Sequence, residues 1–197
     1  MTNIEFDAAY HEKYSVFCGI DEAGRGCLCG PVCAAAVILP KGIILEGVDD
    51  SKKLSEKKRE KLYDTVTANA ISYCAAFASP EEIDELNILN ATFLAMRRAV
   101  DGLSVRPEFA LVDGNRIKGL DIPSECIVKG DSKSLTIAAA SIVAKVTRDR
   151  VMRDLAEKYP MYGLSDHKGY PTEKHYEKIR EHGVCEIYRK TFLKKMH

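Results

Sequence analysis

The 197-residue sequence contains no apolar run approaching the roughly 18 residues that a membrane-spanning helix needs. Its first residues, MTNIEFDAAYHEKYS, have neither the basic start nor the apolar stretch of a secretory signal. Seven cysteines are present without any C-x-x-C pair, so neither a disulfide framework nor a zinc ribbon is indicated. We therefore expect a cytoplasmic protein in a reducing compartment. Cys27 and Cys29 could still take part in metal or redox chemistry, but two further ligands at suitable spacing are missing.

The sequence also lacks a net charge, since Lys+Arg and Asp+Glu both number 29. This balance argues neither for nor against a nucleic-acid partner. The basic residues are nevertheless clustered, because the segment SKKLSEKKREK at residues 51–61 holds six basic and two acidic side chains. Such a stripe can bind phosphates, although it can equally be the solvated face of a helix.

The pattern of apolar residues predicts a mixed sheet covered by helices in a single domain. Strands are predicted over 16–21, 32–39 and 71–78, and in the segments FALVDG and ECIVKGDS, the last ending near Asp131. Helices are predicted from the cap Ser55 to about Ala70, and over 89–100, 134–159 and 172–183, the last with Thr172 as its cap. A further helix is predicted to start at the N-cap Ser79, with Pro80 as its first residue and Glu82 as the capping-box partner. The first strands should be antiparallel because a short turn joins the first pair, and the later ones parallel because crossovers join them.

Acidic side chains recur where the predicted strands end. Asp21 and Glu22 follow VFCGI, Asp113 follows FALV, and Asp131 follows CIVKG. If these strands are neighbours, about 4.8 Å apart, four carboxylates converge at one edge of the sheet. Four such charges would repel one another strongly unless divalent cations intervened, and oxygen ligands suit Mg²⁺ or Mn²⁺. Each acid also has an ordinary explanation, as a loop charge, a turn residue or a helix-dipole partner.

Several longer motifs resemble the type 2 ribonuclease H family, ribonuclease HII. They are GIDEAGRG, DSKKLS, LVDGNR, KGDSKS, IAAASIVAKVTRDR and YPMYGLSDHKGYPT, and they span about residues 16–192. The resemblance implies the RNase H-like fold, an α/β mixed five-stranded sheet flanked by helices. It also implies a C-terminal helical part, about 160–197, that contributes to substrate binding. Type 3 enzymes differ by a longer N-terminus with an extra substrate-binding domain.

The resemblance also implies a metal-dependent nuclease. Asp21, Glu22, Asp113 and Asp131 match the family's catalytic, metal-binding carboxylates. The implied reaction is two-metal hydrolysis of the RNA strand of RNA–DNA hybrids, with Mn²⁺ or Mg²⁺, giving 5′-phosphate and 3′-hydroxyl ends. Cleavage is expected on the 5′ side of a ribonucleotide at RNA–DNA junctions, including single ribonucleotides in duplex DNA.

Substrate contacts are implied at three further places. The loop Gly24–Arg25–Gly26 looks like the family's reader of the ribonucleotide 2′-hydroxyl, and Tyr170 matches a tyrosine that packs on the following deoxyribose. The other expected contacts are Ser51, Lys52, Lys53, Asn115 and Lys168, with Arg116 beside Asn115 as a further candidate. Lys145 and Arg148 are as readily structural as functional. A nucleotide phosphate loop is disfavoured because the spacing and the lysine of a P-loop are missing.

Departures from the family pattern are confined to sites away from the carboxylates. They are Cys27 and Cys29 in the first loop, Pro171 after the tyrosine, and Tyr188 where a histidine is frequent. Two rival functions remain at this stage, a non-catalytic hybrid-binding module and a metal-dependent nucleotide hydrolase. The first should have lost a metal carboxylate, and the second has no use for a basic stripe and a sugar-stacking tyrosine. The chain's end shows no sliding-clamp peptide, which predicts a monomer without an obligate protein partner.

Overall fold

The computed structural model describes residues 2–48 and 54–194. The sheet consists of five strands, β1 (Phe17–Ala23), β2 (Val32–Ile38), β3 (Ser72–Ala78), β4 (Phe109–Asp113) and β5 (Ser124–Ile127). The helices are α1 (Asn3–His11), α2 (Glu56–Asn69), α3 (Pro80–Leu86), α4 (Ile88–Asp101), α5 (Leu135–Lys158), α6 (Leu164–His167) and α7 (Glu173–His182). Among these described residues, no helix is both long and apolar enough to span a membrane.

The strand order is β3-β2-β1-β4-β5, so the first strand lies in the middle of the sheet. β1 pairs antiparallel with β2, and β2 antiparallel with β3. β4 pairs parallel with β1 on its other side, and β5 parallel with β4. The predicted mixed sheet is therefore confirmed, including the division into antiparallel and parallel halves.

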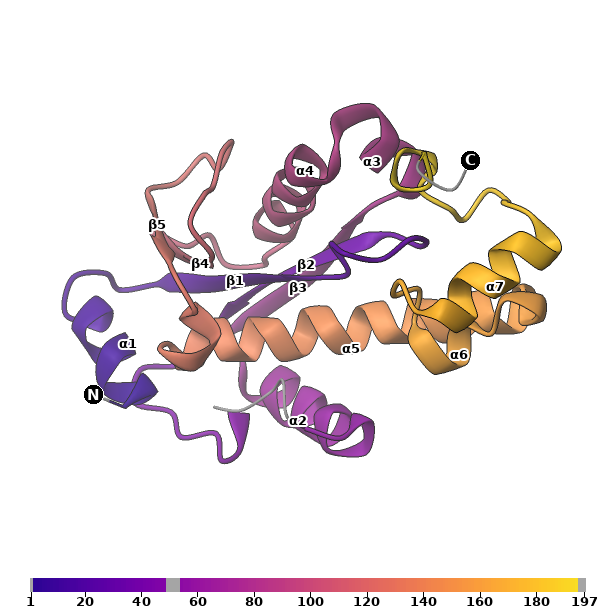
Figure 1. Ribbon diagram of the computed structural model, residues 1–197. Coiled ribbons are helices and arrows are strands. Elements are labelled where there is room, and N and C mark those ends of the chain that lie inside the picture. The colour runs from indigo at the N-terminus through magenta and orange to yellow at the C-terminus, as the bar shows by residue number, and fades with distance from the viewer. Residues whose placement is uncertain (1, 49–53, 195–197) are drawn as a thin grey trace.

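Helices cover both faces of this sheet (Figure 1). α5 packs along β1 and β2 on one face, with α2 outside it, and α4 covers β2 and β3 on the other face. Two apolar clusters fill these layers, one around α5 and the other around α4. β1 and β2 read as almost continuous apolar runs because both of their faces are buried.

The C-terminal part of the chain packs on the far end of α5. α6 and α7 lie there, and the chain then turns back toward the loop between β1 and β2 (Figure 1). An apolar cluster joins this part to Leu28 and Cys29 of that loop. An isolated bridge between Cys29 and Tyr188 adds backbone pairing.

The predicted caps are confirmed where side chains satisfy the first amides of a helix. Ser55 caps α2, and Thr172 caps α7. Ser79 and Glu82 form a capping box at the start of α3, with Pro80 as its first residue.

Two local predictions are wrong or incomplete. Asp131 does not lie at a strand end, because β5 already stops at Ile127 and Lys129 takes a left-handed backbone conformation, φ 56°. Asp131 lies instead in the 3₁₀ turn η2 (Gly130–Ser132) that leads into α5. The helix α1 was not predicted at all, although Thr2 and Glu5 give it a capping box.

Candidate active site

Two of the predicted carboxylates lie at the same level of neighbouring parallel strands. The pairing of β1 with β4 runs up to Ile20 opposite Val112. Asp21 and Asp113 are the next residues on their strands. Because side chains alternate along a strand, Asp21 faces α5 while Glu22 faces the opposite side.

Asp21 is the most enclosed of the acids, with only 4% of its surface exposed. Its Oδ1 accepts a hydrogen bond of 2.7 Å from the Glu22 amide. Burial raises the pKa of Asp21 well above its ordinary value, and the charges of Glu22 and Asp113 raise it further. The anionic form of Asp21 therefore gains strongly from a cation.

Asp113 ties the turn that carries Asp131 to the sheet. Its Oδ1 accepts a 2.6 Å hydrogen bond from the amide of Gly130, the residue before Asp131. The Gly114 amide donates to the Ile127 carbonyl at the end of β5, 3.1 Å away. These two bonds hold the start of η2 against the end of β4, so Asp131 belongs to the same edge of the molecule as Asp113.

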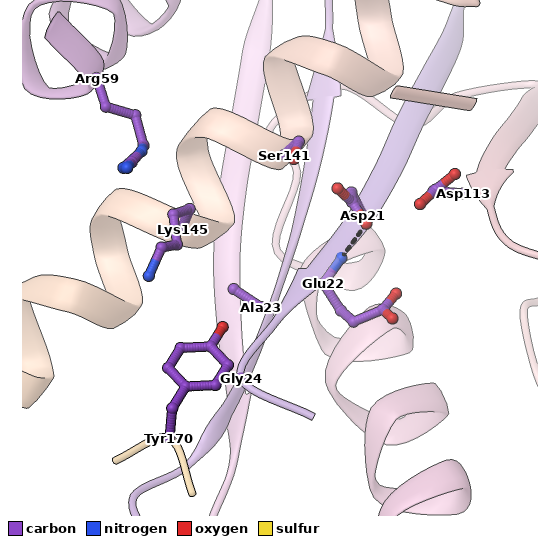
Figure 2. A pocket seen from close by; sticks show the side chains of 9 residues that line it. All are labelled: Asp21, Glu22, Ala23, Gly24, Arg59, Asp113, Ser141, Lys145 and Tyr170. Carbon is purple, nitrogen blue, oxygen red and sulfur yellow. Dashed lines mark hydrogen bonds between the residues drawn. The ribbon is translucent and has the colours of Figure 1, made fainter. Parts of the chain in front are cut away.

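Asp21, Glu22 and Asp113 open onto a pocket of about 370 Å³, whereas Asp131 is not among the residues that line it (Figure 2). Its lining residues are Asp21, Glu22, Ala23, Gly24, Arg59, Asp113, Ser141, Lys145 and Tyr170. The carboxylates occupy one end, and Gly24 and Tyr170 the other, with Arg59 and Lys145 along the side (Figure 2). Negative and positive groups thus face one cavity, as an anionic substrate bound through cations requires.

The Gly24–Gly26 loop follows β1 directly. Gly24 is buried with a φ of +91°, and a Cβ there would lie 1.9 Å from Nε of Arg148, so only glycine fits. Arg25 and Gly26 are exposed. In this structure Arg25 pairs with Glu22 at 3.1 Å.

Tyr170 is 40% exposed and comes from the loop between α6 and α7. Lys145 Nζ lies 5.6 Å from the centre of its ring. The backbone of Tyr170 is fixed by α7, because the Tyr170 carbonyl accepts a 3.0 Å hydrogen bond from His175 Nδ1. His175 is fully buried, and burial lowers its pKa to about 4, so it is neutral and donates from that nitrogen. The ring of Tyr170 is thus presented to the pocket by a rigid support.

The remaining predicted contacts lie outside the pocket lining. Asn115 and Arg116 are exposed, and Lys168 donates to the Ser165 carbonyl at 3.0 Å. Ser51, Lys52 and Lys53 lie outside the described residues, so their placement stays a prediction.

Sequence reasoning missed Ser141 and Arg59 and left Lys145 undecided. Ser141 and Lys145 are four residues apart on α5 and so share one face of it, a spacing visible in the sequence. Arg59 lies in the predicted basic stripe. Within the described part of the chain, Nε and Nη1 of Arg59 are buried and lack a hydrogen-bond partner.

In the ranges 2–48 and 54–194, no three acidic, cysteine or histidine groups are drawn together closely enough to hold one ion. The acids that line the pocket nevertheless offer carboxylate oxygens, which fit a hard divalent cation. Cys27 and Cys29 are fully buried, and burial raises the pKa of Cys29 to about 12, so both thiols stay protonated near neutral pH.

Comparison with known proteins decides the family. The sequence model described as Ribonuclease HII matches residues 18–197. This chain belongs to the ribonuclease HII family. Ribonuclease HII of Burkholderia thailandensis is 55% identical over 96% of this chain and 86% of its own.

Solved structures of related ribonucleases have the same fold. The ribonuclease H2 from Pyrococcus horikoshii matches with a TM-score of 0.77 at 30% identity, covering 89% of this chain and 93% of that one. The ribonuclease HII of Archaeoglobus fulgidus, solved in a complex with PCNA, matches with a TM-score of 0.70 at 31% identity, covering 88% and 93%. The chain therefore has the RNase H-like fold and is an endoribonuclease of the ribonuclease H class, which acts on RNA–DNA hybrids with divalent metal ions.

Proposed function

We propose that this ribonuclease HII cleaves on the 5′ side of a ribonucleotide at RNA–DNA junctions, including single ribonucleotides in duplex DNA. The observation that supports this best is the joint lining of one pocket. Asp21, buried between acids, shares that pocket with Gly24 and Tyr170. The acidic edge and two groups suited to a sugar therefore line the same cavity.

Asp21, Glu22, Asp113 and Asp131 would hold the divalent ions, either Mg²⁺ or Mn²⁺. Two bound ions would supply a water acidified for attack on phosphorus and positive charge at the departing 3′-oxygen. The protein's own part is to place the acids. Asp21 is held by the Glu22 amide and Asp113 by the Gly130 amide, so both carboxylates are oriented before any ion arrives.

The opposite end of the pocket would read the sugar. The Gly24–Gly26 loop offers backbone groups without side-chain hindrance, and a 2′-hydroxyl can both donate to and accept from such groups. The Tyr170 ring would pack on the next sugar, which favours a deoxyribose without its 2′-hydroxyl. Tyr170 belongs to the C-terminal part, 160–197, which would in this way contribute substrate binding to the single catalytic domain.

Positive side chains along the pocket would bind backbone phosphates. Arg59 and Lys145 line it, and Lys145 Nζ is held 2.7 Å from Asp149 one turn further along α5. Arg25, Lys168, Asn115 and the segment Ser51–Lys53 would extend this contact beyond the pocket. Such contacts position the duplex without reading its sequence.

An end-labelled DNA duplex with one embedded ribonucleotide tests the proposal. Incubation with Mg²⁺ or Mn²⁺ should give a single nick on the 5′ side of the ribonucleotide, and EDTA should prevent it. An all-DNA duplex of the same sequence is the control. Cleavage of long RNA–DNA hybrids without a nick at the single ribonucleotide would contradict the junction preference. The protein would then still be a nuclease for RNA–DNA hybrids.

The proposed role is removal of misincorporated ribonucleotides and primer remnants in the cytoplasm by a monomer. Light scattering coupled to size exclusion would check the oligomeric state, for which we expect the 21.9 kDa of one chain. A doubled mass would contradict this part of the proposal.

A further inference from the structure

A buried arginine from the C-terminal segment supports the Gly24–Gly26 loop. Arg189 has no exposed surface. Its guanidinium donates to three backbone carbonyls, Gly24 at 2.8 Å, Arg25 at 2.9 Å and Gly30 at 3.0 Å. All three lie in one loop more than 150 residues away along the chain. The hydrogen bonds thus join the end of the chain to the residues beside the catalytic edge.

These bonds determine which way two peptide groups face. In a trans peptide the carbonyl and the amide N–H point in opposite directions, and no described peptide bond is cis. The Gly24 and Arg25 carbonyls point inward to Arg189. The amides of the same peptide groups, those of Arg25 and Gly26, therefore point away from Arg189, toward the exposed side of the loop. Two adjacent backbone donors are presented there.

A guanidinium is suited to this position because its donors form a planar fork. Nε, Nη1 and Nη2 of Arg189 each reach a different carbonyl, and the Phe192 ring lies 5.3 Å from the guanidinium. Burial lowers the pKa of Arg189 to about 10, which leaves it charged at neutral pH. A lysine ammonium of similar length cannot reach three carbonyls in one plane.

The backbone around Arg189 is itself fixed to the loop. The Arg189 amide donates to the Leu28 carbonyl at 2.9 Å, and the Gly30 amide donates to the Ile187 carbonyl at 2.8 Å. On the far side of Arg189, Asp84 accepts from the amides of Lys190 and Thr191. The backbone on both sides of Arg189 is therefore fixed by hydrogen bonds. This fixes the position of the guanidinium, which can then determine the conformation of the loop.

We propose that Arg189 is a positioning residue for ribonucleotide recognition. By holding the Gly24 and Arg25 carbonyls inward, it presents the Arg25 and Gly26 amides to the sugar of the ribonucleotide. This inference rests on the proposed function, in which that loop discriminates ribose from deoxyribose. Arg189 touches neither the metal carboxylates nor the substrate, so its effect should fall on discrimination.

Arg189→Lys tests the inference, with Arg98→Lys as the matched control. Arg98 also donates to a backbone carbonyl, that of Phe77, but it lies on α4 and pairs with Glu82. Fluorescence anisotropy, with Ca²⁺ replacing Mg²⁺ to prevent cleavage, gives Kd for a one-ribonucleotide duplex and for the same duplex in all-DNA form. The ratio of the all-DNA Kd to the one-ribonucleotide Kd measures discrimination.

We expect Arg189→Lys to lower this ratio about ten-fold, the loss of one or two well-placed hydrogen bonds, while the all-DNA Kd stays unchanged. Arg98→Lys should leave the ratio at its wild-type value. A merely structural role for Arg189 would weaken both duplexes alike. An unchanged ratio in folded Arg189→Lys would overturn the inference and leave the proposed function standing.

Two further results of this experiment would also be decisive. If Arg189→Lys does not fold, Phe192→Leu decides, since it removes the ring beside the guanidinium, and it should lower the ratio about two-fold to three-fold. An unchanged ratio there would overturn the inference. A wild-type ratio near one would overturn the proposed function itself, and the inference with it.

Discussion

Among single residues, Asp21 is the proposed metal ligand whose negative charge is most costly in the folded protein without a cation. It is buried beside Glu22 and Asp113, so its charge is costly until a cation offsets it. Asp21→Asn should therefore abolish cleavage, at least about 1,000-fold in kcat, while substrate binding persists. The same variant should unfold at a higher temperature than the wild type in EDTA, because a buried charge has been removed.

Asp121→Asn is the matched control for this substitution, since Asp121 is exposed. It should change neither rate nor melting temperature. Single-turnover cleavage and differential scanning calorimetry measure the two properties. An active Asp21→Asn enzyme would remove Asp21 from the catalytic set.

The Tyr170 ring is expected to govern junction selectivity more than affinity. Tyr170→Ala should reduce the preference for a single ribonucleotide over a long hybrid by about ten-fold in kcat/KM, as loss of one stacking contact implies. Tyr170→Phe should keep it, because the ring does the packing. Tyr73, 42% exposed on β3, gives the control Tyr73→Ala. Equal losses on both substrates would return Tyr170 to a structural role.

The sequence predicts the carboxylates better than their supports. Asp21 and Asp113 follow apolar runs, and a strand that ends in an acid is visible without a structure. The apolar residues of CIVKG predict a strand that runs up to Asp131, yet β5 ends at Ile127, before the left-handed Lys129. The role of Arg189 rests on backbone carbonyls far along the chain, which no local pattern reveals.

Among the elements, β1 and α5 approach each other closely, backbone against backbone, at Gly19. A Cβ at Gly19 would lie 2.4 Å from the carbonyl carbon of Thr136 and 2.5 Å from the Ile137 nitrogen, both backbone atoms. Gly19→Ala should destabilise the protein by about 3 kcal/mol or more, since neither strand nor helix can yield. It should also impair catalysis, because Asp21 lies two residues further on.

Urea unfolding measures the effect of Gly19→Ala on stability. Gly26→Ala serves as the stability control, because a Cβ there meets nothing within 4 Å. A Gly19→Ala protein as stable as wild type would mean that α5 can shift away from β1.

The helix α1 is attached to α5 through one buried acid. Asp7 Oδ2 accepts from the Thr136 amide at 2.8 Å and from its hydroxyl at 2.7 Å. Burial raises the pKa of Asp7 above its ordinary value of 3.8. The folded state therefore holds this proton more tightly than the unfolded state, and its contribution to stability falls as pH rises from 3.8 through the folded pKa.

Asp7→Asn should remove that dependence. The wild type should lose stability relative to the variant between pH 4 and pH 7, and urea unfolding at the two pH values measures the difference. Asp7→Ala, which loses both hydrogen bonds, should be less stable than Asp7→Asn by about 1–3 kcal/mol at either pH. A pH-independent difference between wild type and Asp7→Asn would contradict the assignment. The sequence could not predict this contact between α1 and α5, because Asp7 and Thr136 are 129 residues apart.

For the whole molecule, the apolar periodicity was sufficient to predict the layers. Strands buried on both faces alternate with capped helices, and this order leaves few alternatives to a mixed sheet with helices on both sides. The return of the chain's end to the β1–β2 loop was not predictable in the same way. It depends on the pairing of Cys29 with Tyr188 and on the Arg189 bonds, which bring distant segments together.

The folded molecule should be stabilised by the ions it uses. Its acids are gathered at one edge only when the sheet and η2 are in place, so divalent cations bind the folded chain in preference to the unfolded one. At about 100 times Kd, Mn²⁺ or Mg²⁺ should add about 2.7 kcal/mol, which raises the melting temperature by several degrees. Asp21→Asn should lose most of this rise, and Asp121→Asn should keep it. Because the measurement needs no substrate, an equal rise in wild type and Asp21→Asn would place the ions elsewhere on the protein, whatever the cleavage assay shows.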